Sequence, residues 1–196
     1  CGRVSFVLGM QGPCATFDTA CSSAAVASHS SLRALQRSEC NAALSAGVNM
    51  IMDPAAMRGN AIAGFTSVTG RSHTFDARAD GYGRGEGIVV MACRQGADAP
   101  VGLGVLALGS AVRQDGRTAS LTAPSGQAQQ RVLRAAFADA HVASDEVALL
   151  ECHGTGTALG DPIEAGSLVA TVLRARGAPL GLGGVKANIG HAEPAA

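Results

Sequence analysis

The chain is poor in aromatic and charged residues. Its 196 residues include no tryptophan and one tyrosine, only 15% are Asp, Glu, Lys or Arg, and the formal net charge is zero. The pI of about 7.1 indicates no excess of positive charge with which the chain could bind nucleic acid. No apolar run approaches the roughly 20 residues that span a bilayer, and no signal-peptide pattern is present. These absences exclude nucleic-acid binding and membrane spanning, and we expect a cytoplasmic protein, or a plastid one in an alga.

The scarcity of charge comes with an abundance of apolar residues. Hydrophobic residues make up 47% of the chain, so few charges remain to keep a large surface in water. The length predicts a single domain. The first residues, Cys1-Gly2-Arg3, have no initiator methionine. We therefore expect a piece of a larger body, or a subunit with a substantial interface.

The six cysteines show no disulfide or metal pattern. They are irregularly spaced, and no CxxC pair occurs among them. A chain of this composition is not a short disulfide-stapled scaffold, so we expect reduced thiols. No cluster of Cys and His has zinc-like spacing, and we predict no metal site.

Hydrophobic periodicity and turn residues predict alternating strands and helices, which is typical of an α/β protein. A long glycine-rich stretch, 59–87, is expected to be an irregular but ordered functional segment. The predicted strands are 15–20, 42–52, 88–93, 101–112, 147–152 and 180–186, and the predicted helices are 22–37, 127–141 and 161–176. The near-continuous apolar character of 42–52 favours a strand covered on both faces.

One cysteine, Cys21, occupies a position that is typical of a catalytic nucleophile. Cys21 follows the apolar stretch 15–20 and precedes small residues that begin a predicted helix. A helix N-terminus favours the thiolate, and a sharp strand-to-helix turn exposes the side chain. The alternative is a buried structural cysteine, which is common for a lone Cys.

Two histidines lie in glycine-rich settings that leave an imidazole accessible. They are His153, in Cys-His-Gly-Thr-Gly-Thr, and His191, in Lys-Ala-Asn-Ile-Gly-His. Histidine is the side chain most easily tuned to exchange a proton near neutrality. The other histidines, 29, 73 and 141, lack such framing and are expected to be surface or loop residues.

These segments and several others resemble the β-ketoacyl synthase (ketosynthase) domain of type I polyketide synthases and fatty acid synthases. The resemblance is collinear over nearly the whole chain. It is carried by Asp-Thr-Ala-Cys-Ser-Ser (18–23), Thr-Phe-Asp (74–76), Asp-Gly-Tyr-Gly-Arg-Gly-Glu-Gly (80–87), Gln-Asp-Gly-Arg (114–117), Leu-Thr-Ala-Pro-Ser-Gly (121–126), His-Gly-Thr-Gly-Thr (153–157), Gly-Asp-Pro-Ile-Glu (160–164) and Val-Lys-Ala-Asn-Ile-Gly-His (185–191).

The resemblance implies a thiolase-like, five-layered α-β-α-β-α fold and a decarboxylative condensation in polyketide or fatty acid biosynthesis. By analogy, Cys21 holds the acyl group, and its backbone N–H forms half of the oxyanion hole. His153 and His191 assist decarboxylation of a malonyl-type extender, and Lys186 supports their charge network. Thr155 and Thr157 contact the phosphopantetheine arm. The implied partners are acyl carrier protein, its acyl and malonyl-type thioesters, and a second copy of the domain, with no separate cofactor.

Ketosynthase domains are roughly twice this long, so the resemblance implies a partial domain over residues 1–196. It runs from before the nucleophile through the second histidine, with both domain ends missing and the second oxyanion donor on a later loop. The alternative is a non-elongating or structural ketosynthase-like subunit. Such proteins have usually lost the cysteine or one histidine, and this chain keeps all three.

Overall fold

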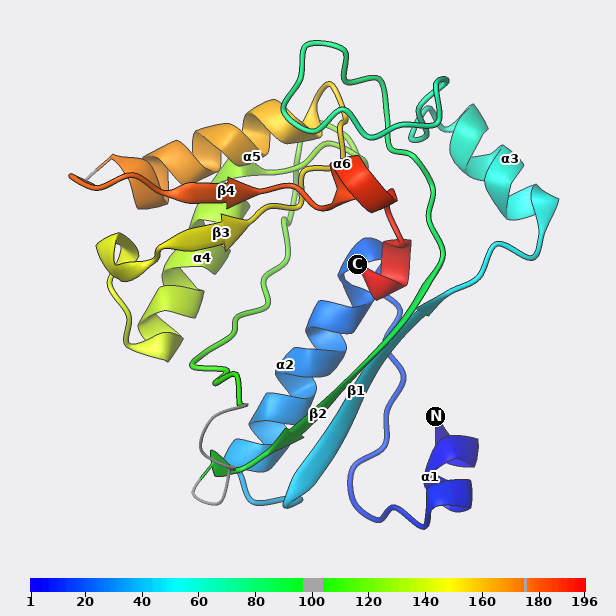
Figure 1. Ribbon diagram of the computed structural model, residues 1–196, viewed down its shortest axis with the longest axis vertical. Coiled ribbons are helices and arrows are strands. Elements are labelled where there is room, and N and C mark those ends of the chain that lie inside the picture. Colours follow the sequence, from blue (N-terminus) through cyan, green and yellow to red (C-terminus); the bar gives the residue numbers. More distant parts are fainter. Residues whose placement is uncertain (97–103, 175) are drawn as a thin grey trace. The chain divides into compact units, whose positions relative to one another are not determined.

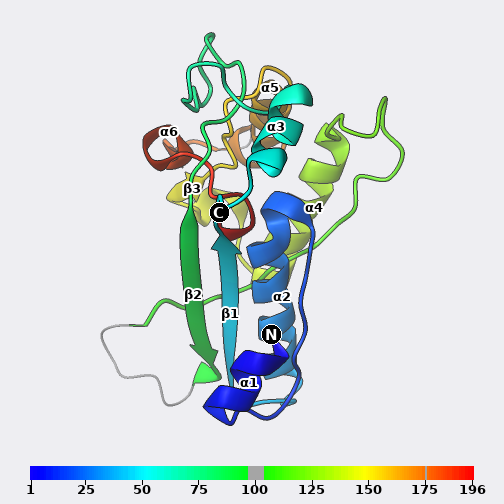
Figure 2. The same ribbon diagram turned by 90° about the vertical axis from the view of Figure 1, so that its right-hand side faces the viewer.

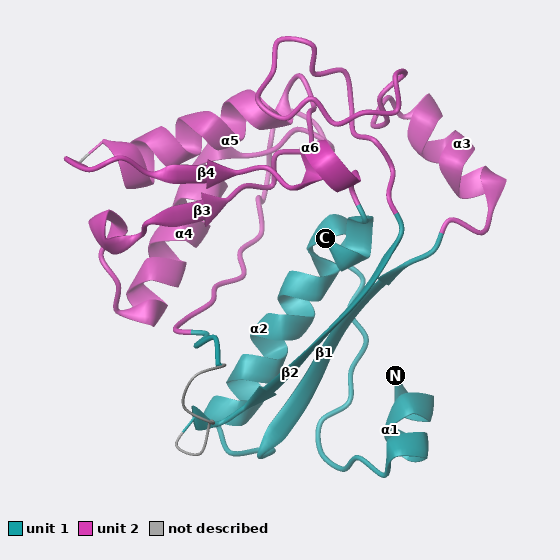
Figure 3. Cartoon of the chain, in the orientation of Figure 1, with its two compact units in different colours: residues 1–50, 86–107, 192–196 teal, residues 51–85, 108–191 magenta. Residues whose placement is uncertain are grey.

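The computed structural model describes residues 1–96, 104–174 and 176–196. They fall into two compact units, coloured separately in Figure 3. Unit 1 contains residues 1–50, 86–107 and 192–196, and unit 2 contains residues 51–85 and 108–191. Each unit is assembled from segments that are distant in sequence.

Unit 1 is a two-stranded antiparallel ribbon with one long helix against it (Figures 1 and 2). Strands β1 (Ala42–Asn49) and β2 (Gly87–Arg94) pair over their whole length, from Ala42 opposite Arg94 to Asn49 opposite Gly87. Helix α2 (Ser23–Gln36) packs on β1, where the hydroxyls of Ser28 and Ser45 lie 2.8 Å apart. Three short helices complete the unit: α1 (Gly2–Leu8), η1 (Ala20–Ser22) and η5 (Glu193–Ala195).

Unit 2 packs helices against a short parallel pair of strands. Leu149 to Glu151 of β3 pair with Gly181 to Gly183 of β4. Its core contains Cys152, Leu168 and Val172, with Phe137 and Leu150 packed around them. The helices are α3 (Pro54–Ile62), α4 (Gly126–Ala140), η3 (Ser144–Glu146), α5 (Gly160–Leu168) with its π-helical continuation η4 (Val169–Leu173), and α6 (Lys186–Ile189).

Most predicted helices and strands are confirmed with small changes at their ends. The helices expected at 22–37 and 127–141 are α2 and α4, and the strand expected at 88–93 is β2. The strands expected at 147–152 and 180–186 are shortened to three residues each. The helix expected at 161–176 is α5 with η4. Local periodicity and caps were sufficient for these elements.

Two predicted strands are wrong, and several short helices, α3 and α6 among them, were not predicted. Residues 15–20 form no strand because no described segment pairs with them, and a strand needs a neighbour for its backbone groups. Of the strand expected at 101–112, residues 101–103 lie outside the described residues and 104–112 are irregular. Helix α3 begins at Pro54, just after the expected strand end at residue 52, with Asp53 as its N-cap.

The sheet around residues 42–52 also differs from the prediction. The strand ends at Asn49 rather than at residue 52, and it pairs antiparallel with β2. Along β1 the buried Ser45 and Gly47 alternate with more exposed neighbours such as Leu44 and Val48. Alternation of this kind is typical of a strand with one covered face.

Candidate functional site

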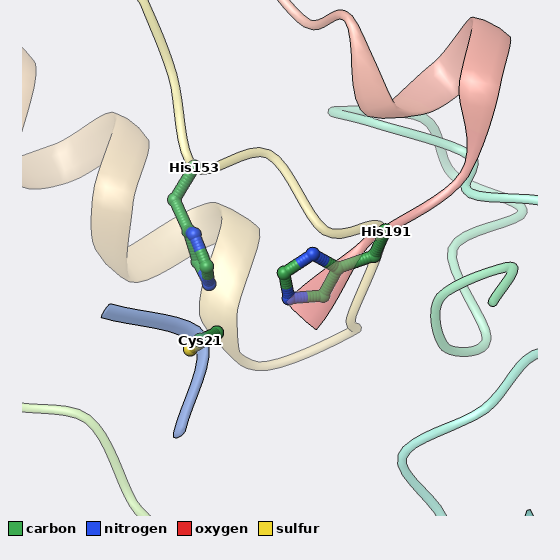
Figure 4. Close-up of side chains that lie close together, drawn as sticks. All are labelled: Cys21, His153 and His191. Carbon is green, nitrogen blue, oxygen red and sulfur yellow. The ribbon is translucent and has the colours of Figure 1, made fainter. Parts of the chain in front are cut away.

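Cys21 lies in a tight helical turn directly before α2. The turn is η1, and the side chain of Cys21, drawn in Figure 4, is partly buried. The preceding residue, Ala20, has a φ of 54°, a left-handed conformation that costs a residue with a Cβ about 1–2 kcal/mol. A turn-to-helix junction therefore presents the cysteine, where the sequence predicted a strand-to-helix junction.

His153 is anchored through its backbone at the end of β3. The carboxylate of Glu164, on α5, accepts the backbone N–H of His153 at 2.6 Å and that of Gly154 at 2.8 Å. On the other side, the Thr74 hydroxyl donates to the Gly154 carbonyl at 2.5 Å. Because charge-assisted hydrogen bonds are the stronger ones, this arrangement fixes the backbone from which the imidazole projects.

His191 is anchored by the glycine-rich segment 80–87. The backbone N–H of His191 donates to the Gly83 carbonyl at 2.7 Å, and the backbone carbonyl of His191 accepts the Gly85 N–H at 2.9 Å. The turn before it needs Gly190, whose φ is 76° and whose Cβ, if present, would lie 3.0 Å from the Arg84 carbonyl oxygen. The side chain of His191 is only 2% exposed.

The two imidazoles meet edge to face within unit 2 (Figure 4). Their ring centroids are 5.5 Å apart at an interplanar angle of 89°. Tyr82 contacts the ring of His191 in the same manner, at 5.0 Å and 78°. His191 thus lies between an aromatic ring and a second imidazole.

Both histidines are biased toward their neutral forms. Burial lowers the pKa of His191 to about 4, with smaller contributions from His153 and from the positive charge of Lys186. The pKa of His153, an exposed residue, is also lowered, by partial loss of water around its ring and by the charge of Lys186, against the opposing effect of Glu164 and Asp161. Neutral imidazoles at pH 7 each carry one N–H and can donate a hydrogen bond without titrating.

The loop of Thr155 and Thr157 is held by a buried carboxylate. Asp161, 3% exposed, accepts the N–H groups of Gly156 at 3.1 Å and Thr157 at 3.3 Å. Its other oxygen accepts the Phe75 N–H at 2.8 Å. Thr155 is buried, and the Thr157 hydroxyl accepts the Gly160 N–H at the start of α5. Asp161 lies inside the first turn of α5 and there accepts hydrogen bonds from the loop that precedes the helix.

Five of the six predicted site residues belong to one unit. Unit 2 contains Lys186, 8% exposed, with both histidines and both threonines, and unit 1 contains Cys21. The sequence also placed the other histidines in surface or loop positions. His141 is exposed and closes α4 in a left-handed conformation, His73 lies in a loop, and His29 is half-buried on α2.

Sequence reasoning missed how Glu164, Asp161 and Tyr82 act. All three lie in segments that carried the family resemblance, yet nothing in their local sequence shows which backbone groups or rings they contact. Their contacts join segments up to 109 positions apart, between Tyr82 and His191. Only the folded chain reveals them.

Two family models match the chain, and together they cover nearly all of it. The family model described as "Beta-ketoacyl synthase, N-terminal domain" matches residues 1–99, and "Beta-ketoacyl synthase, C-terminal domain" matches residues 105–196. The chain therefore belongs to the β-ketoacyl synthase family.

Its relatives include polyketide synthases. Erythronolide synthase EryA3 of Saccharopolyspora erythraea is 48% identical over 202 residues, which cover all of this chain and 6% of that protein. Pikromycin polyketide synthase component PikAII of Streptomyces venezuelae is 47% identical over 200 residues, covering all of this chain and 5% of that protein. The chain thus spans a small fraction of the length of these relatives.

The fold also matches solved ketosynthases. The ketosynthase from module 6 of the bacillaene synthase of Bacillus subtilis 168 superposes with a TM-score of 0.93 at 33% identity. The match covers 100% of this chain and 36% of that one. The predicted thiolase-like α/β fold is confirmed for the part of the fold that this chain represents.

The six cysteines are all free thiols. No disulfide joins any of the six cysteines, all of which lie in described residues. Burial and the nearby carboxylates of Glu164, Glu151 and Asp161 raise the pKa of Cys152 to about 11, so this thiol is a poor nucleophile. Within the described ranges, no helix is both long and apolar enough to cross a membrane.

Proposed function

We propose that this chain carries the reacting groups of a condensing acyltransferase, a β-ketoacyl-[acyl-carrier-protein] synthase in polyketide or fatty acid biosynthesis. The observation that supports this most is the pair of neutral, edge-to-face histidines, anchored from three distant segments. A cysteine hydrolase needs one imidazole and an orienting carboxylate or amide. Two adjacent imidazoles are better suited to hold one oxygen between two donors.

In the first half-reaction, Cys21 accepts the acyl group. Its thiolate attacks the carbonyl carbon of an acyl thioester, the carbon–sulfur bond of that thioester breaks, and the carrier leaves as a thiolate that takes up the proton lost by Cys21. The tetrahedral oxyanion needs backbone donors. By the family resemblance, the Cys21 N–H is one of them and a loop outside these 196 residues supplies the other.

In the second half-reaction, His153 and His191 stabilise an enolate. A malonyl-type thioester loses CO₂, and the electrons of the broken carbon–carbon bond move onto its thioester oxygen. The imidazole N–H groups of His153 and His191 donate hydrogen bonds to that oxygen. Such hydrogen bonds stabilise a charge more strongly where little water is present. The carbanion then attacks the acyl carbon on Cys21, the carbon–sulfur bond breaks, and a β-ketoacyl thioester leaves.

The remaining residues fit supporting roles in this proposal. The buried ammonium of Lys186 helps keep both imidazoles neutral, because its charge lowers both pKa values. Thr155 and Thr157, on the loop held by Asp161, contact the phosphopantetheine arm. We further propose that acyl carrier protein delivers both thioesters, that residues 1–196 are part of a ketosynthase domain that acts as a homodimer in the cytoplasm, and that no separate cofactor takes part.

The test is condensation by the full-length protein. The unsubstituted protein should convert an acyl thioester and malonyl-carrier protein into CO₂ and a β-ketoacyl thioester, and a β-lactone or epoxide probe should label Cys21. Cys21→Ala should abolish both the product and the label, with His141→Ala, at an exposed helix end, as the matched control. Condensation that survives Cys21→Ala would overturn the proposal, and a protein that neither labels nor condenses supports a structural subunit.

A further inference from the structure

We propose that Ser23 is a positioning residue for Cys21, acting through the peptide bond that joins Ala20 to Cys21. The proposal rests on the nucleophilic role given to Cys21 above. It is carried by the contacts of one buried hydroxyl at the start of α2, and these contacts lie entirely within residues 19–23.

The hydroxyl of Ser23 bridges the two residues before Cys21. It accepts the backbone N–H of Thr19 at 2.9 Å and donates to the backbone carbonyl of Ala20 at 2.7 Å. A serine hydroxyl has one hydrogen to donate and two lone pairs, so it can make both bonds at once. The side chain is 7% exposed, so water has little access to replace either bond.

The Ala20 carbonyl controls the direction of the Cys21 N–H. The two groups belong to one peptide plane and, because the bond is trans, point in opposite directions. The carbonyl receives a second donor, the backbone N–H of Ser23. Two hydrogen bonds to one oxygen hold that plane, and the N–H proposed to stabilise the oxyanion is held with it.

The same bridge keeps Ala20 in an unfavourable conformation. Its φ of 54° is one that alanine rarely adopts and that the surrounding structure must maintain. Ser22 adds a hydrogen bond of 2.9 Å from its hydroxyl to the Thr19 carbonyl, but it does not reach Ala20. Among the side-chain hydrogen bonds described for this turn, only that of Ser23 reaches the Ala20 carbonyl.

The experiment measures, in the full-length protein, how fast iodoacetamide alkylates the Cys21 thiol and how fast an acyl thioester acylates it. Iodoacetamide labelling is followed across a pH series, and peptide mass spectrometry reads the label at Cys21 apart from the other cysteines. The variants are Ser23→Ala, which removes the hydroxyl, and Ser23→Thr, which keeps it. Ser28→Ala is the matched control, because that serine, on the same helix, bonds the Ala24 carbonyl and meets Ser45 without touching the turn.

We expect Ser23→Ala to slow labelling of Cys21 and acyl transfer to it about tenfold, since small misplacements of a reacting group have effects of this size or larger. Ser23→Thr should stay within about threefold of the unsubstituted rate, and Ser28→Ala within about twofold, on the same reasoning. Circular dichroism and thermal unfolding of each variant separate misplacement from misfolding.

Three results would overturn the proposal. The first is that Cys21 in Ser23→Ala is labelled as fast as in the unsubstituted protein. The second is that Ser28→Ala slows labelling of Cys21 as much as Ser23→Ala does. The third is that Ser23→Thr slows labelling of Cys21 although it unfolds at the same temperature as the unsubstituted protein. If the unsubstituted protein forms no β-ketoacyl product, the proposed function fails, and the labelling comparison still decides the role of Ser23.

Discussion

The turn that holds Cys21 and the scaffold that holds the two histidines are built in opposite ways. The hydrogen bonds that fix the turn between Asp18 and Ser23 include several that join residues no more than four positions apart. The histidines depend on partners such as Gly83 for His191 and Thr74 for Gly154, the latter 80 positions away. The backbone of the Cys21 turn is thus fixed in part by short-range hydrogen bonds, although η1 also packs against η5, whereas the histidine pair is anchored by long-range partners within unit 2.

The comparison is tested most severely by removing the thiol itself. Cys21→Ala should lower condensation at least about a thousandfold, because no other group can hold the acyl chain during catalysis. The same variant should leave the unfolding of the protein nearly unchanged, since a partly buried side chain loses one atom. Product formation and thermal unfolding, measured together, check this. A large loss of stability would show that the turn is less independent than its hydrogen bonds indicate.

Glu164 tests the histidine scaffold directly. Glu164→Ala leaves the backbone N–H groups of His153 and Gly154 without their acceptor, so the backbone that carries the His153 imidazole is no longer held in place. We expect kcat to fall about a hundredfold, a typical cost for a misplaced catalytic group, while labelling of Cys21 changes little. The pKa of His153 should fall further, because the charge of Glu164 raises it.

Steady-state kinetics and NMR titration of His153 measure both effects, and Glu146→Ala is the matched control. Glu146 also accepts a backbone N–H, from Ala143, but in an exposed turn. A Glu164→Ala variant with unchanged kcat would show that the long-range anchor is dispensable.

How far the sequence predicts each region follows from the same contrast. The motif around Cys21 predicted the start of α2 within one residue, because helix signals are local. It also predicted a strand at 15–20 that does not form, because a strand depends on a partner that the motif cannot specify. His153 and His191 were found from their glycine-rich settings, but their contact was not, since it depends on how β3, α6 and the segment 80–87 pack.

Acidification should destabilise the histidine region before the Cys21 turn. The pKa of His191 is lowered from a usual 6.5 to about 4, so below pH 6.5 the unfolded state binds more protons than the folded state. The contribution of neutral His191 to the free energy of unfolding is therefore complete above pH 6.5 and is lost as the pH falls toward 4. It amounts to about 3 kcal/mol at most. Hydrogen exchange of peptides covering 186–191 and 19–23, between pH 4 and 7, measures the two regions side by side.

In this measurement, His191→Gln removes the titrating group and serves as the control. The opening free energy of 186–191 should then lose most of its dependence on pH across this window, with the remainder coming from His153, whose pKa is also lowered. An equal dependence in both proteins would mean that other groups account for the acid sensitivity.

The smallest expected effect distinguishes the aromatic support of His191 from its backbone anchor. Tyr82→Leu removes the ring that meets His191 edge to face at 5.0 Å, whereas Tyr82→Phe keeps it. An aromatic pair contributes about 0.5–1.5 kcal/mol beyond its buried area, so Tyr82→Leu should lower kcat between about twofold and tenfold. Tyr82→Phe should stay within about twofold on the same scale. Equal losses in both variants would shift the role from the ring to the hydroxyl, and no loss in either would leave the hydrogen bonds of His191 to Gly83 and Gly85 as its sufficient support.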